Sequence, residues 1–134
     1  MPAKTGTSTT TPERPYLGWV DPASVGEPYG DTVDGLLTFR GNPTRTYYGR
    51  GPVPSEPKVV WSYPSQAMCS TSSVGGEATT WCGSGWTGQP AVFERNGETW
   101  VAFGAYDRNV HFLDFETGKA KLPSFPTGDI IKGS

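Results

Sequence analysis

The chain has 134 residues, and 11 lysines and arginines against 13 aspartates and glutamates give it a formal net charge of −2. This balance gives no basic footprint for nucleic acid or for an anionic membrane surface, so no nucleic-acid partner is expected. With 18 glycines, 13 prolines, 13% aromatic residues and no long apolar run, the composition excludes a helical bundle, a coiled coil and a transmembrane segment. It predicts one small all-β domain with an aromatic core.

The N-terminal part of the chain is expected to be largely irregular. Residues 1–15 are rich in Thr, Ser and Pro, which predicts a flexible tail, and they lack the apolar segment of a signal peptide. Residues 16–57 predict an irregular arm, because Gly and Pro separate its apolar anchors. Within this arm, residues 36–39 are a candidate short strand that Gly41 and Pro43 would end.

The next region, residues 58–134, is expected to hold the sheet. Residues 58–63 are β-branched and aromatic and lie between two prolines, which predicts a strand. Residues 64–88 predict a long loop that contains both cysteines. A structureless loop of this length is uncommon in a compact domain unless something pins it or it is functional.

The two cysteines, Cys69 and Cys82, are expected to form a disulfide that pins this loop. The bridge would close a loop of 14 residues, for which the chain-entropy model gives roughly 3 kcal/mol. Two free buried thiols are the alternative. Zinc is poorly supported, because His111 is the only histidine and no Cys-x-x-Cys pair is present. A disulfide would imply an extracytoplasmic location, whether periplasmic, cell-surface or secreted.

The strongest local signal is a β-hairpin formed by residues 90–95 and 98–103. Its turn, Asn96-Gly97, tolerates the positive φ angles that a type I′ turn needs at both central positions. A charge pair and an aromatic pair both fall in register, which supports this alignment. The expected partners are Arg95 with Glu98, Glu94 with Thr99, Phe93 with Trp100 and Val92 with Val101.

Two further strands complete an antiparallel four-stranded meander. Residues 110–113 form the next strand, and residues 121–125 a weaker one that Pro123 confines to an edge. The central strand carries Trp100 on one face and Val101 on the other, so something is expected to cover each face of the sheet. A four-stranded meander covered twice is the design of a β-propeller blade.

Residues 89–128 resemble a repeat of the PQQ-like, quinoprotein-type β-propellers. The matching elements are a strand ending in Gly104, the Tyr106-Asp107 turn, the strand 110–113, Leu113-Asp114 and Thr117-Gly118-Lys119. Upstream, residues 39–45 followed by residues 57–61 are similar to the entry segment of such propellers. The resemblance covers about 90 of the 134 residues. It implies the N-terminal arm and first blade of a propeller.

At two places the sequence departs from the family pattern, and the second place bears on whether the chain belongs with the enzymes of the family. Leu122 and Pro123 stand where the family usually places a docking Trp after Thr-Gly-Lys. Quinoprotein dehydrogenases hold a ring of adjacent cysteines against their cofactor, whereas Cys69 and Cys82 are far apart in sequence, and no calcium-binding carboxylate set is present. The resemblance therefore implies the cofactor-free branch, with no cofactor, metal or catalytic residue in this chain.

Polar residues of the sheet region are interpreted as structural. His111 lies within a strand, and sequence spacing offers no orienting partner for a general base. Asp107 and Asn109 are ordinary turn formers, and the calcium-loop pattern fails after them. Asp114 with Thr117 predicts an Asx-type turn.

Two tryptophans beside the cysteines are the candidate binding residues. Trp81 and Trp86 either pack over the disulfide or form an exposed aromatic platform for a sugar or a protein partner. The sequence leaves both alternatives open.

The sequence thus predicts a non-enzymatic binding or scaffold module from a larger PQQ-like propeller. Apolar Ile130-Ile131 predicts the start of another strand, and one blade cannot bury both of its faces, so the partners are the remaining blades or another protein chain. Residues 16–39 are the candidate cover within this chain. The alternatives are a self-associating structural subunit, or part of a quinoprotein-type oxidoreductase whose catalytic residues lie outside this chain.

Overall fold

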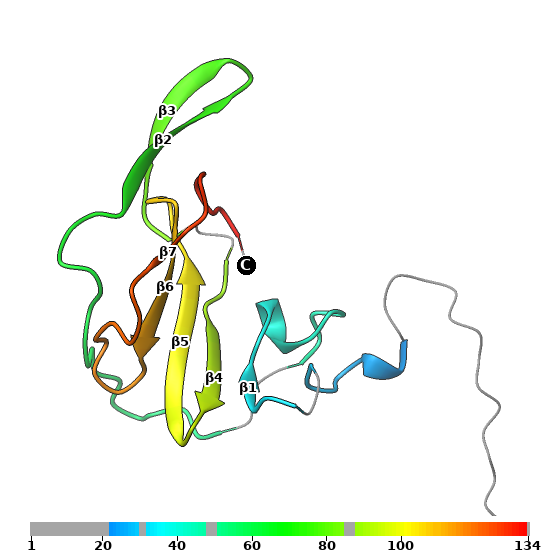
Figure 1. The fold of residues 1–134 in the computed structure, drawn as a ribbon. Helices are drawn as coiled ribbons and strands as arrows, with labels where there is room; N and C mark the ends of the chain where they lie inside the picture. Colours follow the sequence, from blue (N-terminus) through cyan, green and yellow to red (C-terminus); the bar gives the residue numbers. More distant parts are fainter. Residues whose placement is uncertain (1–21, 30–31, 48–50, 85–87, 134) are drawn as a thin grey trace, which may run out of the picture.

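The computed structural model describes residues 22–29, 32–47, 51–84 and 88–133, and these form an all-β molecule (Figure 1). A five-stranded antiparallel sheet has the order β1-β4-β5-β6-β7, and a separate two-stranded ribbon pairs β2 with β3. The strands are β1 (Gly35–Leu36), β2 (Cys69–Val74), β3 (Glu77–Cys82), β4 (Ala91–Arg95), β5 (Glu98–Gly104), β6 (Asn109–Asp114) and β7 (Phe125–Pro126). The predicted all-β class is confirmed.

Helical structure in the described part of the chain is limited to two 3-10 turns of three residues. These are η1 (Pro22–Ser24) and η2 (Phe39–Gly41). Within this part, no helix has the length and apolarity needed to cross a membrane.

The β4–β5 hairpin forms as the sequence predicts. Asn96 and Gly97 have φ angles of 56° and 77°, which suit a type I′ turn. All four predicted cross-strand pairs are present, and Ala91 opposite Ala102 adds a fifth. Phe93 and Trp100, in one of these pairs, stack with ring centroids 6.3 Å apart. The turn therefore fixes the register of the two central strands.

The third strand of the meander is confirmed, and the fourth is shorter than predicted. β6 pairs with β5 over most of its length, from Val110 to Asp114. In the fourth position β7 pairs with β6, and Ala120 makes an isolated bridge to Leu113, so the predicted strand 121–125 is wrong except at its last residue. Lys121 instead donates its backbone N–H to the carbonyl of Phe112, after which Pro123 interrupts the ladder because it has no N–H to donate.

An additional strand, β1, extends the sheet at the free edge of β4. The predicted strand 36–39 is wrong beyond Leu36, because Phe39 begins η2 and Arg40 takes a left-handed conformation with φ 55°. β1 approaches β4 so closely that a Cβ on Gly35 would lie 2.2 Å from the carbonyl oxygen of Val92. The described part of the arm thus adds an edge strand to the sheet.

A single buried amide organises the arm. Asn42 is 1% exposed, and its Nδ2 donates to the carbonyls of Ser24 at 3.0 Å and Glu27 at 2.7 Å. Its Oδ1 accepts the backbone N–H of Thr46 at 2.8 Å. The amide hydrogens and the amide oxygen of Asn42 all have partners, so burying this polar side chain stabilises the arm. The arm is thus held together by hydrogen bonds and not by an apolar core.

The register divides the central side chains between two faces of the sheet. We define the first face as Ala91, Phe93, Trp100, Ala102, Val110 and Phe112, and the second face as Val92, Val101, Phe103, His111 and Leu113. On the first face only Trp100 is buried, whereas Val101, His111 and Leu113 are all buried on the second. The second face therefore holds most of the core.

The cover of the second face comes from a segment that the sequence pattern misidentified. Residues 58–63 form no strand, and Val59 and Val60 are 85% and 80% exposed. Trp61 and Tyr63 alternate with exposed residues, as in a strand. The outer edge of β6, however, already pairs with β7 and with the backbone around Lys121. Residues 58–63 therefore find no free backbone groups on β6 with which to form a strand.

The two half-buried aromatic residues of this segment contact different parts of the body: Trp61 contacts the turn after β6, and Tyr63 contacts the sheet. Trp61 lies against Gly118, where a Cβ would come within 2.5 Å of the indole. Its Nε1 donates to the carbonyl of Phe115 at 2.8 Å. Tyr63 meets the ring of Phe103 edge-on, with centroids 6.2 Å apart. The segment therefore covers the second face through side chains alone.

The predicted loop 64–88 is also wrong, because it contains the β2–β3 ribbon. Gly75 and Gly76 form its two-residue turn with φ angles of 64° and 88°, and the ribbon projects beyond the end of the sheet (Figure 1). Half of its twelve strand residues are Ser or Thr. No alternation of apolar and polar residues marks the two strands, because neither face of the ribbon is buried.

We predict that Gly97→Val lowers the free energy of unfolding by about 1 kcal/mol or more, because a β-branched residue resists positive φ. Asn96→Gly is the matched control and keeps the turn, since glycine adopts the same conformation. Thermal and urea unfolding of both variants measures the difference. An unchanged stability of the Val variant would contradict the type I′ turn.

Candidate functional site

The first face of the sheet is the candidate binding surface. Its side chains Phe93, Ala102, Val110 and Phe112 are only half-buried, and Phe125 on the neighbouring β7 is 62% exposed. Their apolar area remains in contact with water, which is unfavourable for a sheet face.

A short C-terminal segment lies at one end of this face. Ile131 packs against Gly104, where a Cβ would come within 2.3 Å of its side chain, and donates its backbone N–H to Ala105. The strand predicted to begin at residues 130–131 is wrong, because the described residues 130–133 form no ladder.

The opposite end of the first face is closed by charged side chains around Trp100. Lys121 Nζ lies 5.1 Å from the ring centroid of Trp100 and Arg95 Cζ lies 5.4 Å from it. Lys121 also pairs with Glu98 at 3.0 Å and Asp114 at 3.2 Å. The hydrogen bond with Glu98 is the main reason that the pKa of Lys121 is raised. Trp100 is thereby shielded while the rest of the face is not.

The turn after β6 is the predicted Asx-type turn. Asp114 Oδ1 accepts the backbone N–H of Thr117 at 2.8 Å and its hydroxyl at 2.7 Å. These two bonds, followed by that with Lys121, lower the pKa of Asp114. The carboxylate is therefore engaged in holding the turn that presents Gly118 to Trp61.

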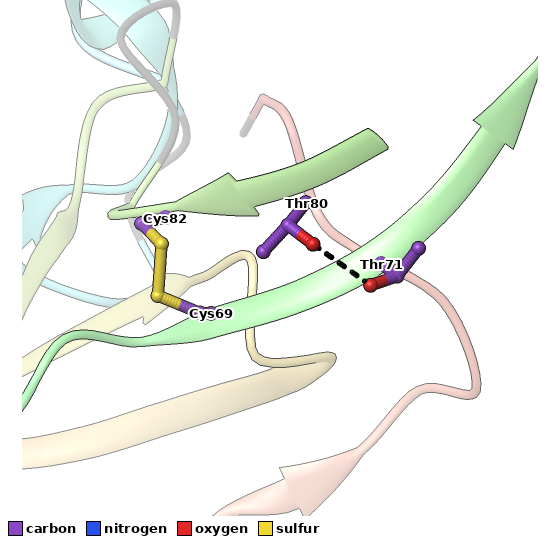
Figure 2. The surroundings of a disulfide bond; sticks show 4 residues. All are labelled: Cys69, Thr71, Thr80 and Cys82. Atoms are coloured by element: carbon purple, nitrogen blue, oxygen red, sulfur yellow. Dashed lines mark hydrogen bonds between the residues drawn. A yellow bond between two sulfur atoms is a disulfide. The ribbon is translucent and has the colours of Figure 1, made fainter. Parts of the chain in front are cut away.

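The sulfur atoms of Cys69 and Cys82 lie 2.05 Å apart, at disulfide distance, as the sequence predicts. The two residues are direct cross-strand partners at the base of the ribbon, and Figure 2 shows the bridge beside the hydroxyl pair of Thr71 and Thr80, whose oxygens are 3.0 Å apart. Such a pair is compatible with an extracytoplasmic location.

Of the two candidate platform residues, the structure describes only Trp81. Its ring meets Tyr106 edge-on with centroids 6.0 Å apart, and Lys132 Nζ lies 4.3 Å from its centroid. Trp81 thus packs at the junction of ribbon, sheet and C-terminal segment. Trp86 lies outside the described residues, so the two-tryptophan platform stays a prediction.

His111 has two orienting partners, which sequence reasoning missed. The imidazole is 5% exposed, with Nε2 3.0 Å from Asp107 Oδ2 and Nδ1 3.2 Å from the hydroxyl of Tyr63. It also stacks on Phe103 with centroids 5.2 Å apart. Asp107 lies only four positions before His111, in the turn between β5 and β6, so this spacing was the available signal. No signal in the sequence marks Tyr63.

This hydrogen-bonded chain holds the segment of residues 58–63 on the sheet. If the Asp107 carboxylate accepts the Nε2 proton, Nδ1 is left to accept the proton of the Tyr63 hydroxyl. Both ring nitrogens are then engaged within the protein, so the arrangement fits a structural role. Asp107 Oδ1 also accepts the backbone N–H of Asn109 at 3.2 Å. Over the described ranges, no three His, Cys, Asp or Glu side chains are placed to share a metal ion.

Comparison with known proteins gives no relative: no family model, no curated protein and no solved structure matches the chain.

We predict that thiol titration under denaturing, non-reducing conditions detects no free thiol. Reduction should then expose both cysteines and make the ribbon sensitive to proteases, since roughly 3 kcal/mol of loop constraint is lost. A Cys69→Ser/Cys82→Ser variant is the control, and reductant should leave its digestion pattern unchanged. Two reactive thiols before reduction would exclude the bridge.

Replacing Tyr63 with Phe tests the role of the His111 chain. The variant leaves a buried imidazole nitrogen without a partner, so we expect a loss of about 1 to 2 kcal/mol in unfolding free energy. Tyr29→Phe is the control, because Tyr29 is 52% exposed and surface changes stay within about 0.5 kcal/mol. Equal losses in the two variants would contradict a structural role of the hydroxyl.

Proposed function

We propose that this chain is a non-enzymatic binding or scaffold module. The single observation that supports the proposal is the first face, an apolar sheet surface on which only Trp100 is buried. A large aromatic side chain buries 150–250 Å² at about 25 cal/mol per Å². Covering Phe93, Phe112 and Phe125 would therefore contribute several kcal/mol.

The partner that best fits this surface is another β-sheet. Sheets pack face to face about 10 Å apart through interdigitating side chains. The half-buried Phe and Val side chains of the first face, with small Ala91 and Ala102 between them, suit such packing. The partner is therefore proposed to be the remaining blades of a propeller, or another protein chain.

The propeller assignment rests on the resemblance and on topology. β4, β5, β6 and β7 lie side by side in sequence order, which is the arrangement expected of a blade. The proposal is that this sheet is one blade of a PQQ-like propeller of the cofactor-free branch. The cysteine pair supports a periplasmic, cell-surface or secreted location for it.

The test places charges on the first face. We predict that Ala102→Glu/Phe112→Glu lowers binding of a hydrophobic dye to the isolated chain severalfold, because it makes the apolar surface polar. Val59→Glu/Val60→Glu is the matched control, since these valines are exposed but lie outside the sheet. Circular dichroism checks that both variants keep the sheet.

The mass of the same proteins in solution shows whether the partner is a second copy of the chain or a different protein. A monomer with first-face dye binding supports a module for a different sheet. A dimer that the first-face variant dissociates would overturn the proposal in favour of a self-associating structural subunit. Dye binding that only the control variant reduces would show that the first face is not the docking surface.

A further inference from the structure

A second candidate surface lies at the β1–β4 edge of the sheet, and Phe93 is the lining residue that it shares with the first face. There the chain forms a recess of about 330 Å³. It is lined by Asp34, Gly35, Leu36, Tyr47, Val92, Phe93, Glu94 and Thr99. Leu36 and Val92 are direct cross-strand partners and supply apolar side chains, while Tyr47 supplies an aromatic ring.

Two carboxylates share this recess as neighbours across the sheet. The register pairs Gly35 with Phe93, so the next step places Asp34 opposite Glu94. The backbone N–H of Glu94 donates to the carbonyl of Asp34 at 2.8 Å, which continues the ladder. Opposed residues share a face with their Cβ atoms about 5 Å apart, and like charges in such a pair are destabilising.

No cation compensates this pair among the described residues that line the recess. Nearby basic side chains are engaged elsewhere: Arg95 lies over Trp100, and Lys121 pairs with Glu98 and Asp114. A cation bound in the recess would therefore be attracted by two carboxylates whose backbones are direct neighbours in the ladder.

The recess combines apolar side chains with a carboxylate held in position, which suits a ligand with an apolar stem and a charged end. Thr99 Oγ1 donates to Glu94 Oε1, which fixes that carboxylate and leaves its second oxygen to accept. Leu36 and Val92 match the methylene groups of a long basic side chain, whose charged end would reach the carboxylates. A guanidinium fits best, because it binds carboxylates through several N–H groups and stacks on aromatic rings such as Tyr47.

We propose that this recess binds an arginine side chain of a protein partner. The side chains that carry the argument, Asp34, Glu94 and Val92, lie on the second face and at its edge. The proposal therefore goes beyond the module function and is independent of partner binding at the first face. Charge complementarity and the apolar contact together select a basic peptide over an acidic or purely apolar one.

The experiment titrates the isotope-labelled full chain with a blocked peptide, acetyl-Gly-Leu-Arg-Leu-Gly-amide, followed by NMR. The expected shifts are confined to the amides that line the recess. The same peptide with citrulline in place of arginine is isosteric but uncharged, and it should bind more weakly. Raising the salt concentration should weaken only the arginine peptide.

Variants assign the effect to the two carboxylates. Asp34→Asn and Glu94→Gln should each weaken arginine binding about threefold, as expected for loss of one exposed ion pair. The double variant should no longer distinguish arginine from citrulline. Glu77→Gln, on the distant ribbon, changes the net charge equally and should have no effect.

The outcomes separate this proposal from the first. Absence of binding in the millimolar range, equal binding of the two peptides, or equal weakening by Glu77→Gln would overturn it. The dye-binding result on the first face would be unchanged by any of these. Binding that maps to the first face instead would also overturn this proposal.

Discussion

The positive φ angles at Asn96 and Gly97 are the constraint on which the rest of the structure depends. They fix the register of β4 against β5, and a slip of one residue would exchange every side chain between the two faces. The same register places Trp100 among cations on one side and Val101 in the core on the other.

The two faces are completed by different means. The second face is covered by residues 58–63, which form no strand. The Tyr63 hydroxyl ties this segment to His111 on β6, and the Trp61 indole ties it to the turn after β6. A polar anchor of this kind sets the position of the segment more narrowly than apolar contact alone, because it has a fixed direction. The first face has no comparable cover in the described residues, and its Phe and Val side chains are only half-buried.

The sequence predicts correctly those elements that are determined by residues close together in the chain. The Asn-Gly turn, the alternation around it and the two cysteines predict the central hairpin and the pairing of Cys69 with Cys82. Contacts between distant residues carry no such signal: Tyr63 and His111 are 48 positions apart, and the Asp34–Glu94 pair depends on a strand of two residues. The ribbon was missed for another reason, since half of its strand residues are Ser or Thr and leave no hydrophobic period to detect.

The base of the β2–β3 ribbon is attached to the body of the molecule at several points, and these attachments limit how the ribbon can move. Its attachments to the body of the molecule include the bond from the Tyr106 N–H to the Gly83 carbonyl and the bond from Arg108 to the Thr71 carbonyl. Trp81 also contacts the ring of Tyr106 and lies under Lys132. With the covalent link of Cys69 to Cys82 between them, the two strands cannot separate at this end. A displacement of the Gly75-Gly76 tip would therefore be resisted first at the β5–β6 turn, because Tyr106 and Arg108 of this turn contact the ribbon base.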